Sequence, residues 1–387
     1  MGVPKKRALI LAAAIAVLAI GGAVNAQAAS PRATDSWTVQ FSLRQKPAEF
    51  DGITCPTRTF CVADGQAVVE QTSNGGKDWA SDALERYFTV FRVSCSSAFV
   101  CRGVGLTRGG NYQKFMTETA RSMWVPSSGI EDEIEPTSIE ALSCPTFSEC
   151  VAVGANNLIG GNANGFPYWK STTQTSEAGH LSGWRASLIP FRHGSIVVGL
   201  DSVDCPSASV CYALAQLRDD GVVVLKTTTG AAQWFRVSIT NSQAVSRTGV
   251  MSDQFSDLSC ATVASCAVVG VGPGGHLIIV ETDNGGLRWH WSVEPRPPTP
   301  TPDQPYIYPA VSCASATSCT ATDGARLLNT SDGGERWSSF FEPKSDGLPS
   351  ALSCPAPNEC FVTTELPISV KLQGEGLWSS DIVLWRR

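Results

Sequence analysis

Short runs of alternating apolar and polar residues recur along the chain, and turns rich in Gly, Ser, Thr, Asn and Asp separate them. Trp37 to Leu43 (WTVQFSL) is the first such run. Alternation with a period of two is typical of half-buried β-strands, and polar turns between such strands indicate hairpins. The pattern therefore predicts an all-β chain of short antiparallel strands.

A pair of cysteines six positions apart marks one hairpin in every repeat, and a short apolar run follows each pair. Pairing across the mouth of a hairpin is the connection that disulfide geometry allows most readily, so we expect seven local bridges of about 2 kcal/mol each. The seven pairs use all fourteen cysteines: Cys55 and Cys61, Cys95 and Cys101, Cys144 and Cys150, Cys205 and Cys211, Cys260 and Cys266, Cys313 and Cys319, Cys354 and Cys360.

A second hairpin ending in a tryptophan follows each cysteine hairpin. Each repeat of roughly 40 to 60 residues thus has four short strands, and such units bury their apolar faces only against their neighbours. Four antiparallel strands are the content of a propeller blade. We therefore expect residues 30–387 to form one seven-bladed β-propeller domain. The tryptophans stand at Trp79, Trp124, Trp184, Trp234, Trp289, Trp337 and Trp378.

Three of the second hairpins resemble the Asp-box, or bacterial-neuraminidase repeat. This motif is a structural turn between the third and fourth strands of a blade in sialidase-like propellers and in secreted propellers similar to photosystem II assembly factors. The resemblance implies a fold and no chemistry. It rests on Thr72, Asn74, Gly76 and Trp79, on Thr282, Asn284, Gly286 and Trp289, and on Thr330, Asp332, Gly334 and Trp337.

The way in which the ring closes stays open at this point. Trp37 to Leu43 resembles a fourth strand that completes the last blade from the front. Leu377 to Trp385 also reads as a fourth strand of the seventh repeat. Either the two termini share one blade or one of them adds a strand.

Strand parity divides the turns between two faces. Turns after the first and third strands of a blade lie on one face, so the cysteine turns and the Asp-box-like turns should share it. The opposite face receives most of the length variation, which is where a rigid scaffold usually carries its site. The long segments are Ser127–Thr137, Ala155–Gly165, Pro190–Asp201, Asn241–Ser256 and Ser292–Pro309.

The first 29 residues read as a secretory signal peptide, with Lys5, Lys6 and Arg7 before an apolar run and Ala26 and Ala28 in cleavage-site spacing. An uncleaved anchor is the alternative reading. Cleavage removes three cations and takes the net charge from −6 to −9, which disfavours nucleic-acid binding. Paired cysteines fit a secreted or envelope protein in an oxidising compartment. A zinc site is not expected, since none of the four histidines lies near a cysteine pair. We also expect a monomer without another metal or a cofactor.

Most candidate binding residues lie on the long loops, and Tyr168 and Trp169 are further aromatic candidates for the surface. A binding scaffold for a protein or an extracellular glycan is the favoured reading. A glycoside hydrolase is the alternative, and it requires two converging carboxylates. Asp201, Asp204, Asp253, Asp257 and Asp323 are further acids near strand ends, and no pattern pairs them. We assign no catalytic residue. The binding candidates are Glu131, Asp132, Glu133, Glu135, Tyr168, Trp169, Arg192, His193, Tyr306 and Tyr308.

Overall fold

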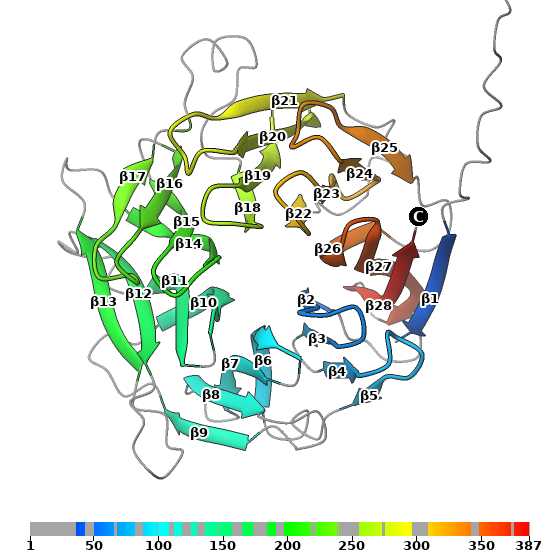
Figure 1. Cartoon of the computed structure of the whole chain (residues 1–387). Coiled ribbons are helices and arrows are strands. Elements are labelled where there is room, and N and C mark those ends of the chain that lie inside the picture. Colours follow the sequence, from blue (N-terminus) through cyan, green and yellow to red (C-terminus); the bar gives the residue numbers. More distant parts are fainter. Residues whose placement is uncertain are drawn as a thin grey trace, which may run out of the picture. The chain divides into compact units, whose positions relative to one another are not determined.

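The computed structural model contains seven four-stranded antiparallel sheets, which can be followed in chain order in Figure 1. It describes residues 36–42, 50–65, 68–81, 88–98, 100–107, 112–117, 125–129, 136–146, 148–156, 165–172, 184–190, 197–217, 221–237, 239, 255–272, 275–295, 309–341, 348–372 and 375–386.

Each sheet takes four strands, ordered from the first to the fourth. Sheet 1 has β2 (Gly52–Thr54), β3 (Cys61–Gly65), β4 (Val68–Thr72) and β5 (Ala80–Ser81); sheet 2 has β6 (Phe88–Ser97), β7 (Val100–Thr107), β8 (Tyr112–Thr117) and β9 (Val125–Gly129); sheet 3 has β10 (Pro136–Ser143), β11 (Glu149–Asn156), β12 (Gly165–Thr172) and β13 (Trp184–Pro190); sheet 4 has β14 (Val197–Asp204), β15 (Cys211–Leu217), β16 (Gly221–Thr227) and β17 (Phe235–Val237). Sheet 5 has β18 (Phe255–Cys260), β19 (Cys266–Val271), β20 (Leu277–Thr282) and β21 (His290–Glu294); sheet 6 has β22 (Ala310–Cys313), β23 (Cys319–Thr322), β24 (Leu327–Thr330) and β25 (Ser338–Phe341); sheet 7 has β26 (Leu348–Ala356), β27 (Glu359–Leu372), β28 (Glu375–Arg386) and β1 (Ser36–Ser42).

All seven predicted disulfides are confirmed. Each joins cysteines six positions apart, with Cα atoms 4.0 to 4.1 Å from each other. In every sheet the bridge closes the turn between the first and second strands. The staple therefore fixes the same hairpin seven times and leaves the other turns free to vary.

The sheets contact one another through their first strands. Each of β2, β6, β10, β14, β18 and β22 contacts the first strand of the next sheet, and β26 contacts β2. Figure 1 shows these first strands innermost. Seven sheets, seven stapled hairpins and contact between the last sheet and the first fit a seven-bladed propeller.

Hydrogen bonds between neighbouring sheets explain why serine so often precedes the first cysteine of a pair. The Ser312 hydroxyl accepts the N–H of Cys354 in the next sheet at 3.0 Å. Ser353 accepts the N–H of Cys55 at 2.9 Å, which joins sheet 7 to sheet 1. Asp204 takes the same position in sheet 4, and its carboxylate accepts the N–H of Cys260 at 2.7 Å.

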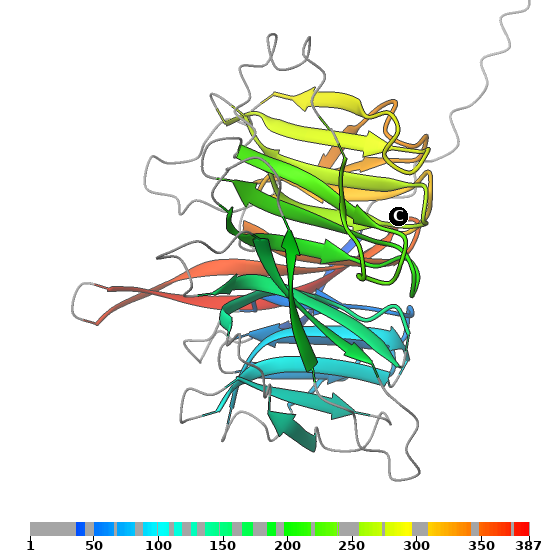
Figure 2. The same cartoon turned by 90° about the vertical axis from the view of Figure 1, so that its left-hand side faces the viewer.

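Sheet 7 contains strands from both ends of the described chain. β1 is its fourth strand and pairs antiparallel with β28, with Trp37 opposite Trp385. Leu377–Trp385 is therefore part of the third strand, and its reading as a fourth strand is wrong. The two termini share the sheet because β28 leaves its outer edge to β1. Figure 2 shows β27 and β28 extending beyond the other strands on one side.

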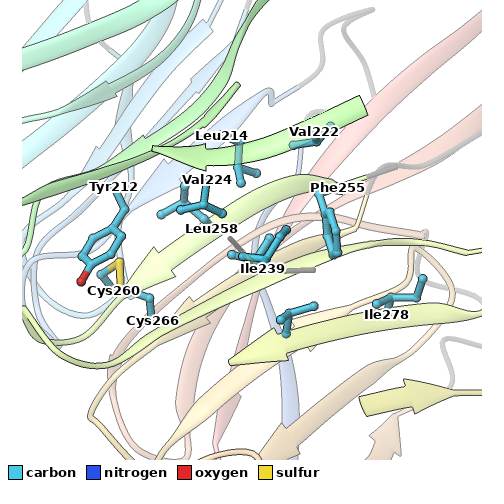
Figure 3. Close-up of a cluster of buried hydrophobic side chains, with 12 residues drawn as sticks. Tyr212, Leu214, Val222, Val224, Ile239, Phe255, Leu258, Cys260, Cys266 and Ile278 are labelled. Atoms are coloured by element: carbon cyan, nitrogen blue, oxygen red, sulfur yellow. A yellow bond between two sulfur atoms is a disulfide. The ribbon is translucent and has the colours of Figure 1, made fainter. Parts of the chain in front are cut away.

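Apolar side chains fill the space between adjacent sheets. The cluster in Figure 3 lies between sheets 4 and 5 and contains Tyr212, Val224, Phe255, Leu258 and Ile278, all less than 5% exposed. The disulfide between Cys260 and Cys266, which closes the first hairpin of sheet 5, belongs to the same cluster. The staples thus form part of the core in addition to closing turns.

The turns between the third and fourth strands share one hydrogen-bond pattern in sheets 1, 5 and 6. In sheet 6 the Thr330 hydroxyl donates to Asp332 at 2.8 Å and accepts the N–H of Gly334 at 3.0 Å. The N–H of Gly333 donates to the Thr317 carbonyl in the disulfide turn at 3.0 Å. Both kinds of turn therefore lie on one face, as parity predicts. We call it the stapled face and the opposite one the loop face.

The turn between the third and fourth strands of sheet 4 has the same hydrogen bonds, although its sequence lacks the Asn-Gly-Gly or Asp-Gly-Gly of the other three turns. The Thr227 hydroxyl accepts the N–H of Ala231 at 3.2 Å, and Gly230 donates to the Ser209 carbonyl in the disulfide turn at 2.9 Å. Ala231 has φ +67°, where the other three turns have glycine. The hydrogen bonds of the threonine therefore hold the turn even with an alanine in the left-handed region.

Candidate functional site

A β-bulge in the first strand singles out one residue four positions before the first cysteine. The register shifts between Ile139 and Ala141 in β10 and between Leu200 and Ser202 in β14, so Glu140 and Asp201 are the extra residues. The same shift occurs in β6, β18 and β26. A bulge re-aims a side chain and is a common device at functional sites.

Four consecutive sheets place charged residues at or beside this position. Asp51 directly precedes β2, and Arg92, Glu140 and Asp201 follow on β6, β10 and β14. The Arg92 guanidinium donates to the Glu140 backbone carbonyl at 2.6 Å, which links sheets 2 and 3. We call these four residues the inner arc. It contains three carboxylates and one guanidinium.

The inner arc lies toward the loop-face end of the first strands. Each first strand runs from the loop face to the disulfide turn on the stapled face, and a residue four positions before the cysteine is about 13 Å from it. The extended hairpin of β27 and β28 ends at the loop face, because a turn between second and third strands lies there. The arc and this hairpin thus belong to one face.

Burial and like charge act together on the arc carboxylates. Burial and, to a smaller extent, the neighbouring Glu140 carboxylate together raise the pKa of Asp201 to about 6. Burial also raises the pKa of Asp51, although the Arg92 guanidinium lowers it. The negative charge of the arc is therefore costly, and a cation placed against Glu140 and Asp201 would relieve that cost.

Two further acids lie next to the arc: Asp64 is buried and Asp257 is half-buried. Asp257 accepts the N–H of Val311 in sheet 6 at 2.9 Å and the Ser202 hydroxyl of sheet 4 at 3.1 Å. Asp64 lies opposite Gly52, and a Cβ on that glycine would be 3.0 Å from an Asp64 carboxylate oxygen. Burial raises the pKa of Asp257 to about 6 and that of Asp64 to about 7.

The arrangement suits binding of a cationic group better than metal coordination. Within the described ranges, no three His, Cys, Asp or Glu side chains come close enough to hold a metal ion. A Lys or Arg side chain needs only one or two carboxylates, and charge-assisted hydrogen bonds to them are strong where water is partly excluded.

In the described part of the chain, no helix is long and apolar enough to cross a membrane.

The binding candidates from the sequence stay predictions. Tyr168 and Trp169 lie on β12, the third strand of sheet 3, and their side chains are outside the described part. The sequence did not indicate Asp51, Arg92 or Glu140. The remaining candidates lie outside the described residues: Glu131, Asp132, Glu133, Glu135, Arg192, His193, Tyr306 and Tyr308.

Comparison with solved structures establishes the architecture. YCF48 bound to a D1 peptide is similar over 91% of this chain and 96% of its own, with 13% identity and a TM-score of 0.54. YCF48 from Cyanidioschyzon merolae is similar over 91% and 99%, with 14% identity and a TM-score of 0.57. The chain has the fold of a β-propeller.

A glycoside hydrolase has the same kind of fold. An ancestral GH74 enzyme is similar over 88% of this chain and 47% of its own, with 14% identity and a TM-score of 0.53. At these identities the likeness concerns the fold alone. No family description matches the sequence, and no curated protein matches it. The propeller therefore has structural neighbours of both binding and hydrolytic types.

Proposed function

We propose that this chain is a secreted, non-catalytic seven-bladed propeller of the Asp-box type that binds a protein segment through its loop face. In this proposal the leader is cleaved, and residues 30–387 form one closed ring. The seven disulfides support an oxidising compartment. The segment presents a Lys or Arg side chain to the inner arc, and the long loops and the hairpin of β27 and β28 surround it.

The observation that carries the proposal is the bulge that brings Glu140 and Asp201 together on neighbouring first strands. Their mutual repulsion contributes to the raised pKa of Asp201. A guanidinium or ammonium group between them would be attracted to both carboxylates in a partly desolvated site. YCF48 supports the partner class, since a solved structure contains it with a peptide.

The test measures binding of peptides with and without a central basic residue to the mature protein. We expect peptides with a central Lys or Arg to bind at least about tenfold tighter than the same peptides with Ala. The double variant Glu140→Gln and Asp201→Asn should abolish this preference, because it removes both charges and keeps the side-chain shapes. Asp283→Asn is the matched control, since Asp283 is exposed on the stapled face. Equal binding by the double variant would refute the proposal.

A glycoside hydrolase is the second candidate, and the same two carboxylates favour it. Asp201, with a pKa raised to about 6, can hold a proton for a leaving group, and Glu140 can act as the second carboxylate. The test is release of reducing sugar from extracellular polysaccharides. Release by the wild type that is lost in Asp201→Asn would favour hydrolysis over binding as the function. Binding without sugar release would support the scaffold.

A further inference from the structure

Exposed large apolar side chains concentrate on two neighbouring sheets. Among the described residues, four such side chains are prominent: Phe235 is 52% exposed, Val263 46%, Leu287 86% and Val293 43%. Phe235 belongs to sheet 4 and the other three to sheet 5. Exposed apolar residues scattered singly need no explanation, but a local group of them indicates an interaction surface.

The fold itself does not require an apolar residue at the most exposed of these positions. Leu287 follows the two glycines of the turn between β20 and β21. The equivalent turns have Lys77 in sheet 1, Ala232 in sheet 4 and Glu335 in sheet 6. All of these turns form with the same threonine hydrogen bonds. Leu287 therefore contributes little to the turn, and its apolar surface is left for another role.

Contacts of the turn bring three of the four side chains into one region of the stapled face. The N–H of Gly285 donates to the Ala264 carbonyl at 2.8 Å, which places the turn beside Val263. On its other side, a Cβ on Gly286 would be 2.8 Å from a methyl carbon of Val237. Phe235 is two residues before Val237 on β17 and so faces the same side of that strand. Val293 lies farther along β21.

Buried polar contacts hold this region in place from below. The Tyr212 hydroxyl donates to the Val263 carbonyl at 2.9 Å. The Lys226 ammonium donates to the Gly285 carbonyl at 2.7 Å and lies 5.0 Å from the centre of the Tyr212 ring. Both turns are thus fixed by side chains of sheet 4. A surface that is already ordered loses less entropy when a partner binds.

Two cations lie beside the apolar group, against one exposed acid in the same turn, Asp283. Arg288 is exposed directly after Leu287, and the Lys226 ammonium lies under the turn on a neutral carbonyl. Neither cation forms an ion pair with a described acid, whereas the whole chain has a net charge of −6. A partner with an apolar side chain between carboxylates would match both properties.

We propose that Phe235, Val263 and Leu287 form a docking surface for a protein segment that carries an apolar side chain flanked by acidic residues. The surface lies on the stapled face, so a partner bound there leaves the inner arc on the loop face accessible. The protein would then bridge two partners through its two faces. The docking surface itself does not depend on the function proposed for the inner arc, whereas the bridging role rests on that function.

The test uses three labelled synthetic peptides of about twelve residues and fluorescence polarisation at low salt. The first has a central Phe-Leu pair flanked by Glu, the second has Lys in place of Glu, and the third has Ala-Ala in place of Phe-Leu. We expect the first to bind the wild type at least about tenfold tighter than the other two. Raising the salt concentration should weaken that binding, because exposed charges are screened.

Two substitutions at one position separate the apolar from the electrostatic contribution. Leu287→Glu should weaken the first peptide at least about tenfold, and Leu287→Lys should weaken it less, since Lys keeps the positive charge. Both variants should fold, because Lys77 and Glu335 occupy the equivalent position in other sheets. Val293→Glu is the matched control on β21 and should leave binding unchanged.

Several outcomes would overturn the proposal. The first is no binding of any peptide, and the second is equal binding of the acidic and basic peptides. The third is unchanged binding by Leu287→Glu. Sedimentation provides the fourth: self-association of the wild type that Leu287→Glu abolishes would assign the surface to a second copy of this chain.

Discussion

A methyl group added to Gly334 tests how tightly neighbouring sheets fit at the stapled face. Gly333 and Gly334 are consecutive in the turn after β24, and both have positive φ, +74° and +87°. A Cβ on Gly333 would meet only the Ala316 carbonyl oxygen, at an ordinary 3.7 Å. A Cβ on Gly334 would overlap the carboxylate of Glu281 from sheet 5. Two adjacent substitutions thus share a backbone cost and differ in one steric clash.

The magnitudes follow from those contacts. Placing alanine in the left-handed region costs about 1 to 2 kcal/mol, which is the full expected effect of Gly333→Ala. Gly334→Ala also displaces Glu281, whose carboxylate accepts the indole N–H of Trp337 at 3.3 Å. Loss of a hydrogen bond to a charged group adds about 1.5 to 3 kcal/mol. We therefore expect a loss of about 2.5 to 5 kcal/mol for Gly334→Ala.

The assay is urea unfolding of the oxidised protein, followed by tryptophan fluorescence, with free energies from the midpoint and slope. A second substitution separates the clash from the backbone cost. In a Glu281→Ala background, Gly334→Ala should cost no more than Gly333→Ala, because the overlapping carboxylate is gone. In a Glu281→Gln background the clash should remain, since the side chain keeps its size, and the extra cost should be smaller only by the charge-assisted part of the bond to Trp337.

Two results would refute this reasoning. Equal losses for Gly333→Ala and Gly334→Ala would show that the neighbouring sheet does not constrain the turn. A full loss in the Glu281→Ala background would show that the cost arises within the turn itself. Either result would also weaken the account of these turns as contacts between sheets.

Three further perturbations test a buried acid, a contact between sheets and the shared sheet 7. Burial raises the pKa of Asp64 to about 7, above its unfolded value of about 4. Between these pH values the folded state binds one proton more than the unfolded state. The free energy of unfolding should therefore fall as the pH rises from about 4 to 7. Asp64→Asn should reduce that fall in urea unfolding at a series of pH values, and an unchanged fall would contradict the assignment. Ser353→Ala leaves the Cys55 N–H without its acceptor and should cost about 1 to 3 kcal/mol in the same assay; a cost near zero would argue against the bond between the last and first sheets. Deleting residues 36–42 removes the outer strand of sheet 7 and the Ser42 hydroxyl that donates to Asp381 at 2.5 Å. The exposed edge of β28 should increase aggregation on size-exclusion chromatography, and a peptide of those residues should reverse it. A monomeric, equally stable deletion variant would refute the shared sheet.

Local spacing made much of the fold predictable from the sequence. Five residues between paired cysteines allow one hairpin, and seven such hairpins with a second hairpin after each one predict seven four-stranded sheets. The same reasoning failed at Leu377–Trp385, because strand order depends on which neighbour a strand pairs with. It also missed the turn at Thr227, where hydrogen bonds of the threonine replace the glycine signal.

The inner arc was not predictable for a related reason. Glu140 lies in an alternating stretch, and simple alternation assigns the direction of its side chain wrongly once a bulge shifts the register. Asp201 was noted only as an acid near a strand end. Its pairing with Glu140 appears when sheets 3 and 4 are placed side by side, since the two residues are separated by a complete hairpin repeat in the sequence.

The shared sheet 7 sets an order for folding. Each disulfide closes a loop within one hairpin, whereas Ser42 meets Asp381 across a separation of 339 residues. Contacts that distant form late, because the chain between them must be organised first. During synthesis, β1 emerges before the other described strands but finds its partner only when β28 follows. Among the described strands, the first to be synthesised is thus the last to be paired, and every pause in synthesis prolongs the exposure of its unpaired edge.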